Sequence, residues 1–190
     1  MKYFLAIVLL FCCFYQLSAQ EVCWCDFTVL SENGQYIAKI QAIDADKGET
    51  DYRSDWKIKV FEHANGQETL LWEAPYRYAG KPMGALSNDG QYFTYVENWY
   101  SKDELLIQIY KNGQKVPSPI NGRSLDIPRR KLKKGELHYY WLTETGNPYT
   151  YKQDTAGKPF LVIHSTDGNR FTVDLDHGTF REKSSLTASF

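Results

Sequence analysis

The sequence predicts an all-β fold built from about three antiparallel repeat units. Three observations indicate this: Asn-Gly or Asp-Gly pairs lie between apolar segments, two stretches repeat the same order of residues, and no long helical periodicity is present. Such a pair tolerates positive φ at both central positions of a type I′ turn, so each pair predicts a hairpin. The five pairs are Asn33-Gly34, Asn65-Gly66, Asp89-Gly90, Asn112-Gly113 and Asp167-Gly168.

Residues 1–19 have the pattern of a signal peptide. Lys2 precedes an apolar run from Tyr3 to Tyr15, and Ala19 supplies a small residue at the expected cleavage site. The run is shorter than the roughly 20 residues that span a bilayer, so we expect no transmembrane anchor after processing. The sequence therefore predicts an exported protein, periplasmic or secreted, in which residues 20–190 form a single domain.

Charge and cysteine content narrow the class of protein. The chain has 22 basic and 23 acidic residues, and this near-neutrality argues against a nucleic-acid binder. After export only Cys23 and Cys25 remain. Residues two apart in a strand are separated by roughly 6.6 Å, so a Cys23–Cys25 disulfide needs a local turn. Pairing with another chain is the alternative, and a metal or redox role is disfavoured because no partner motif accompanies the cysteines.

Two units repeat, and a third is more divergent. The first (27–74) and the second (83–120) share Leu-Ser-x-x-Gly-Gln-Tyr, an apolar strand, and a further strand closed by Asn-Gly-Gln. In the third (131–180), Lys134-Gly135-Glu136 replaces the first turn, followed by predicted strands at 137–142 and 160–164. Ordered agreement at this many positions indicates repeated architecture.

Strand parity predicts which strands are buried. In Tyr92 to Val96 neither set of alternate residues is strongly polar, which is typical of a strand between two layers. In Trp56 to Val60 apolar residues alternate with Lys57 and Lys59, which predicts one wet face. Ser124 to Arg129 has room for a short helical turn ending at Pro128.

The Leu-Ser-x-[Asn/Asp]-Gly-Gln-Tyr element, followed by two strands, resembles the blade repeat of the WD40-like propellers of the TolB type. Glu32 and Asn88 stand where that family commonly has proline. The resemblance implies about three antiparallel propeller-like blades. Because closed propellers use 4–8 blades, three blades predict an incomplete propeller or an open sandwich, whose free edges would favour a homo-oligomer.

Three groups of residues are candidate sites. Asp44, Asp46, Glu49 and Asp51 offer oxygen ligands for calcium, although Gly48 departs from EF-hand spacing, which favours a solvated acidic loop. The second group is a basic run that suits an anionic glycan, a phosphate head group or an acidic partner; a solvated loop is the alternative. The third is two aromatic loops able to stack sugars or hold peptides. The basic run comprises Arg129, Arg130, Lys131, Lys133 and Lys134, and the aromatic loops carry Tyr76, Tyr78, Trp99 and Tyr100.

The function predicted from these features is binding. No nucleophile, phosphate-loop or dinucleotide motif is present, and the four histidines lack metal-ligand spacing. We expect an exported, non-catalytic binding or scaffold protein with no cofactor other than possible calcium, and with a protein or glycan partner in the cell envelope or outside. The alternative is a secreted hydrolase or inhibitor that acts on glycan or peptide through loop residues such as Asp44 and Asp46.

Overall fold

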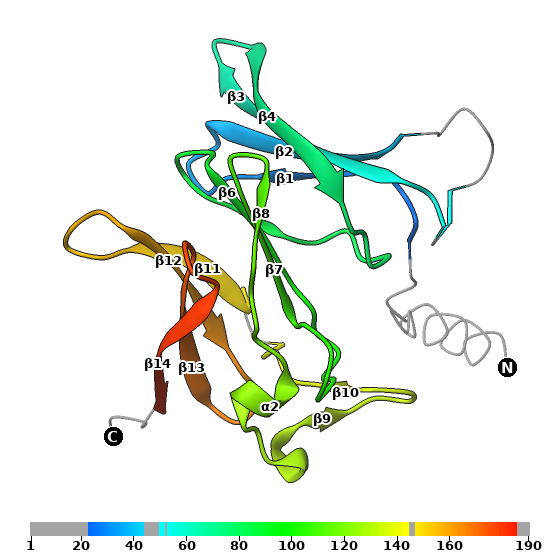
Figure 1. The fold of residues 1–190 in the computed structure, drawn as a ribbon, viewed down its shortest axis with the longest axis vertical. Helices are drawn as coiled ribbons and strands as arrows, with labels where there is room; N and C mark the ends of the chain where they lie inside the picture. The colour runs from blue at the N-terminus through cyan, green and yellow to red at the C-terminus, as the bar shows by residue number, and fades with distance from the viewer. Residues whose placement is uncertain (1–22, 44–49, 52, 145–146, 186–190) are drawn as a thin grey trace, which may run out of the picture.

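The computed structural model describes residues 23–43, 50–51, 53–144 and 147–185, and its regular structure is almost entirely β (Figure 1). It has three four-stranded sheets and one two-stranded hairpin, all antiparallel, and no sheet of the described residues closes on itself. The predicted all-β class is confirmed. The first sheet contains β1 (Phe27–Leu30), β2 (Tyr36–Ala42), β3 (Trp56–Ala64) and β4 (Gln67–Tyr76).

The second and third sheets have the same simple order, in which each strand pairs with the next along the chain. The second contains β5 (Ala85–Leu86), β6 (Tyr92–Val96), β7 (Ile107–Lys111) and β8 (Gln114–Val116); the third contains β11 (Tyr149–Gln153), β12 (Pro159–His164), β13 (Asn169–Asp174) and β14 (Thr179–Ser185). Between them lie the helix α2 (Gly122–Leu125), the 3-10 turn η2 (Arg129–Lys131), and the hairpin of β9 (Lys133–Lys134) and β10 (Tyr139–Tyr140).

All five predicted turns join paired antiparallel strands, but they are of two kinds. Asn65 and Asn112 take positive φ (53° and 48°) with the glycine that follows, as a type I′ turn requires. At the other three pairs only the glycine has positive φ. The prediction of one turn type for all five is therefore wrong, because a serine two residues before the Asn or Asp changes the turn.

That serine closes the turn with its side chain. Ser87 Oγ donates to Asp89 Oδ1 (2.6 Å) and accepts from the Tyr92 backbone N–H (2.9 Å), and Ser31 makes the same pair of contacts. The two turns also contact each other, since the Asn33 backbone N–H donates to Asn88 Oδ1 (2.9 Å). The repeated Leu-Ser motif therefore builds equivalent turns that join the first and second sheets.

The third unit departs from its predicted form. Residues 137–142 were expected to form its inner strand, yet only Tyr139–Tyr140 is a strand, and it pairs with β9 outside the third sheet. The third sheet begins at Tyr149, and its serine turn, Ser165 to Gly168, lies between its second and third strands. The expected strand at 160–164 is present as β12.

The second sheet lies between two apolar cores. Phe93 and Tyr95 pack with the first sheet, whereas Tyr92 and Val96 on the opposite face of β6 pack with the third. This confirms that β6 is buried on both faces. The prediction for β3 is also confirmed, because Trp56, Ile58 and Val60 are buried and alternate with more exposed lysines.

Candidate anion-binding site

The chain between β6 and β7 meets α2 at the lower end of the molecule in Figure 1. Asn121 caps α2 by accepting the backbone N–H groups of Arg123 and Ser124. The Gly122 N–H donates to the Ser101 carbonyl (2.9 Å), and a Cβ at Gly122 would lie 2.2 Å from that oxygen. Glycine therefore permits the close approach of α2 to residues 98–105.

The β9–β10 hairpin closes the other side of this region. The Tyr100 N–H donates to the Tyr139 carbonyl (2.7 Å), and Trp99 forms an antiparallel bridge with Tyr140. Trp141, which is fully buried, donates through Nε1 to the Glu97 carbonyl (2.5 Å). These contacts fix the hairpin against the lower end of the second sheet.

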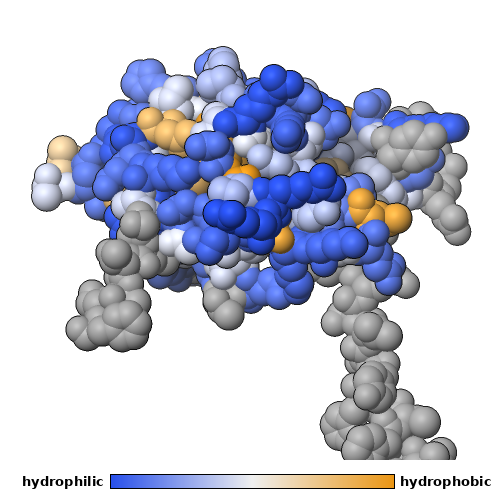
Figure 2. Space-filling model, turned by 90° about the horizontal axis from the view of Figure 1, so that it is seen from below, coloured by the Kyte–Doolittle hydropathy of each residue, from blue (hydrophilic) through white to orange (hydrophobic). Residues whose placement is uncertain are grey.

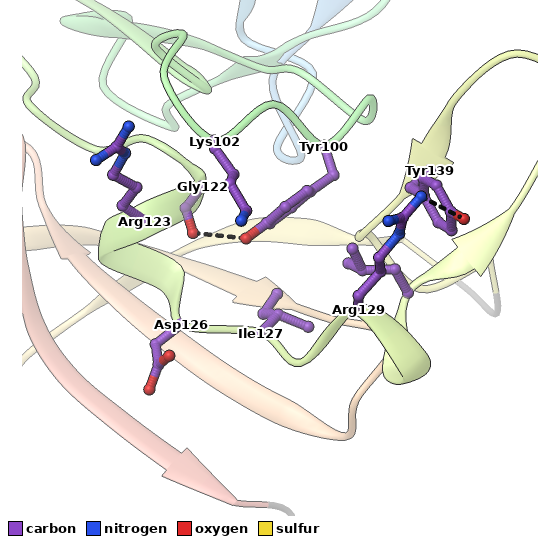
Figure 3. Close-up of a pocket in the computed structure, with 9 residues that line it drawn as sticks. Tyr100, Lys102, Gly122, Arg123, Asp126, Ile127, Arg129 and Tyr139 are labelled. Carbon is purple, nitrogen blue, oxygen red and sulfur yellow. Dashed lines mark hydrogen bonds between the residues drawn. The ribbon is translucent and has the colours of Figure 1, made fainter.

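A cavity of about 680 Å³ lies between these elements, and we call it the cationic cavity (Figure 3). Its apolar part is formed by the buried side chains of Ile127 and Leu132 together with two tyrosine rings. Three cations and one acid line the rest. The lining residues are Tyr100, Lys102, Gly122, Arg123, Asp126, Ile127, Arg129, Leu132 and Tyr139.

Two hydrogen bonds hold the aromatic side chains of the cavity in place (Figure 3). Tyr100 OH donates to the Gly122 carbonyl (2.8 Å), and Arg129 Nη2 donates to Tyr139 OH (3.1 Å). The Arg129 guanidinium also lies 4.8 Å from the centre of the Tyr139 ring, a cation–π contact. Among the residues that the structure describes, Arg129 is thus oriented without a carboxylate partner, which leaves its charge available to an anion.

The charge of the cavity is predominantly positive. Arg123 forms an exposed ion pair with Asp103 (2.5 Å), whereas Lys102 and Arg129 have no ion pair among the described residues. Burial, with a smaller contribution from Asp126, raises the pKa of Tyr100. Tyr100 therefore stays protonated at neutral pH and acts as a hydrogen-bond donor, not as a base.

The predicted basic run begins at the cavity, because its first residue, Arg129, lines the cavity. Arg129, Arg130, Lys131, Lys133 and Lys134 are all exposed, and only Lys133 has an ion pair in the described chain, with Glu144. Seen from below, this end of the molecule is mostly hydrophilic (Figure 2). The fold thus brings together Tyr100 and Arg129, which the sequence analysis placed in two separate candidate sites.

The other three aromatic candidates are already engaged. Tyr76 and Tyr78 are buried in the core between the first and second sheets. Burial raises the pKa of Tyr78 to about 12, and its hydroxyl donates to the Cys23 carbonyl (2.6 Å). His138 stacks on Trp99 at 4.0 Å, and Lys81 Nζ lies 3.8 Å from the Trp99 ring centre. Trp99 is thus already in contact with an imidazole ring and a cation.

The remaining candidates lie near the N-terminal part of the domain. Cys23 and Cys25 form a disulfide with Cα atoms 5.3 Å apart, closer than in an extended strand. Asp44, Asp46 and Glu49 lie outside the described residues. Asp51 accepts the Arg53 backbone N–H (2.7 Å), and no cluster of three potential metal ligands occurs in the described chain. Calcium binding stays a prediction.

Sequence reasoning missed Lys102, Arg123 and Tyr139 as members of the cavity. None of them belongs to a motif, and they come together because α2 and the β9–β10 hairpin fold back onto residues 98–105. The only local signal was Asn121, whose capping position marks the start of α2.

Comparison with known proteins gives little information about the role of the cavity. No family model and no curated protein matches the chain. The solved structures that match include the periplasmic gluconolactonase PpgL of Pseudomonas aeruginosa, with 10% identity, a TM-score of 0.31, and coverage of 85% of this chain and 72% of that chain. A likeness this weak supports no functional argument. No helix within the described ranges is both long and apolar enough to cross a bilayer.

Proposed function

We propose that this protein is an exported, non-catalytic binding protein, and that the cationic cavity is where it binds an anionic group of its partner. The observation that carries the proposal is the placement of Lys102 and Arg129, unpaired within the described chain, beside an apolar floor. A cavity of this size, with few oriented polar groups, is typical of ligand sites.

The residues of the cavity suit binding better than catalysis. Arg129 offers a planar fork of donors that matches a carboxylate, sulfate or phosphate, and its contact with Tyr139 reduces the entropy lost on binding. The raised pKa of Tyr100 makes it a poor base at neutral pH. The exposed basic run next to the cavity favours a partner that carries several negative charges.

Titration with dextran sulfate, followed by calorimetry, tests this proposal. We expect binding that weakens as salt is raised, and no binding of neutral dextran. Arg129→Ala should weaken dextran sulfate binding about tenfold, since charge-assisted hydrogen bonds to an anion are lost. Lys152→Ala, an exposed lysine of β11, is the matched control and should leave binding unchanged.

Equal affinities of the Arg129→Ala and Lys152→Ala variants would show that the cavity is not the site. The alternative of a secreted hydrolase predicts turnover of a glycan or peptide library that Asp44→Asn or Asp46→Asn abolishes. Turnover with that dependence would replace the binding proposal.

A further inference from the structure

We infer that the anionic partner is a lipid bilayer surface, on which the protein docks with the β9–β10 hairpin and the basic run; this inference rests on the proposed function. The side chain that distinguishes a bilayer from other anionic partners is Leu137. It is 88% exposed, at the turn between β9 and β10.

The turn that presents Leu137 is held by the fold. The Gly135 N–H donates to the His138 carbonyl (2.8 Å), and the His138 ring stacks on Trp99, which follows β6 and forms a bridge with Tyr140. A Cβ at Gly135 would lie 2.4 Å from the Tyr140 ring, so the turn packs closely on its own strand. Leu137 therefore projects from a well-supported turn.

The charges beside Leu137 match an anionic surface. Residues 129–138 contain five cations and one acid, Glu136, and all six are exposed. The segment is continuous from η2 through β9 to the turn, so the cations precede Leu137 directly. Basic residues close to an apolar tip are typical of proteins that lie on the membrane interface.

A bilayer withdraws an exposed leucine side chain from water, whereas a soluble polyanion leaves it in water. Withdrawing a leucine side chain from water strengthens binding by about tenfold or more. Each cation near an anionic membrane increases the affinity for that membrane about fivefold. The cationic cavity, with Arg129 at the end of the basic run, would then accept the phosphate of one head group.

Vesicle flotation of the whole purified protein tests the inference. We expect binding to phosphatidylcholine vesicles that contain about 30 mol % phosphatidylglycerol, and little binding to phosphatidylcholine alone. Leu137→Ser should weaken binding to the anionic vesicles about tenfold. Leu70→Ser is the matched control, because Leu70 is also exposed (49%) but lies on β4 of the first sheet.

Comparing variants of the same chain removes any contribution of the apolar segment near the N-terminus. Arg130→Ala and Lys131→Ala should each weaken anionic-vesicle binding about fivefold, and raising NaCl from about 50 to about 500 mM should release the protein. Circular dichroism verifies that each variant is folded.

Failure of the two proposals would look different. One outcome overturns the membrane inference alone: dextran sulfate binding depends on Arg129, but the Leu137→Ser variant floats with anionic vesicles as the unchanged protein does. The binding proposal then stands, and the partner is a soluble polyanion or an acidic protein. If dextran sulfate binding does not depend on Arg129 and the protein does not float with anionic vesicles, both proposals are wrong.

Discussion

At the scale of single residues, Asp176 joins the second and third sheets. It lies in the turn between β13 and β14, and its Oδ1 accepts from Tyr92 OH (2.6 Å) and contacts Lys111 Nζ (2.6 Å), both in the second sheet. These hydrogen bonds, that of Lys111 being the largest contribution, lower the pKa of Asp176. The charged form is therefore more stable in the folded protein than in the unfolded chain.

This lowered pKa predicts how stability depends on pH. The contribution of Asp176 is present above the unfolded pKa of about 4 and is lost as pH falls below it toward the lower folded value. Asp176→Asn should reduce the urea midpoint at neutral pH and narrow the difference between neutral and strongly acidic pH. The side chain of Asp103 is 69% exposed, so Asp103→Asn should change neither the urea midpoint at neutral pH nor its difference from the midpoint at acidic pH. Identical acid sensitivity of Asp176→Asn and the unchanged protein would contradict this account.

At the scale of elements, the two type I′ turns differ in their surroundings. Gly66 and Gly113 have nearly the same φ (75° and 81°), but an added Cβ would meet nothing within 4 Å at Gly66 and would lie 2.8 Å from the Glu73 carbonyl oxygen at Gly113. The β7–β8 turn thus packs against β4 of the first sheet, whereas the β3–β4 turn is open.

The two glycines form a matched pair for measurement. Gly66→Ala should lower the free energy of unfolding by about 1–2 kcal/mol, the cost of left-handed backbone for alanine. Gly113→Ala should cost about 1–3 kcal/mol more, because the backbone of β4 must also move. Urea unfolding of both variants measures the difference, and equal costs would show that the Gly113–Glu73 contact is loose.

Turns and strand parity could be predicted from the sequence because both depend on local residues. Asn-Gly and Asp-Gly pairs located five of the turns between paired strands, and the lack of a polar face in Tyr92 to Val96 located the central strand. The strand expected at 137–142 was wrong, since Tyr139 and Tyr140 pair locally with Lys134 and Lys133. Of the cavity, Tyr100 and Arg129 were candidates, while Lys102 and Arg123 join them only through the fold.

At the scale of the whole molecule, the three sheets form an open stack with polar outer faces. On the first sheet Lys57 pairs with Glu73 (3.1 Å), and Lys39 pairs with Glu68. On the third sheet Asp174 contacts Lys158 and Arg181 (both 3.1 Å). Terminal units with a polar outer face are what an unclosed repeat array requires for solubility. Homo-oligomer formation through the sheet edges stays a prediction that light scattering tests.

Because β6 belongs to both cores, the stack should unfold as one unit. Phe93 is fully buried in the core between the first and second sheets, where its ring lies 5.8 Å from that of Tyr76. Leu161 is fully buried in the core between the second and third sheets. Phe93→Ala should cost about 3–5 kcal/mol and Leu161→Ala about 2–5 kcal/mol. If the cores are coupled, either variant lowers protection from hydrogen exchange equally in β3 and β13. Loss of protection in β3 alone after Phe93→Ala would show that the first sheet unfolds separately, and that the second sheet does not transmit stability between its two faces.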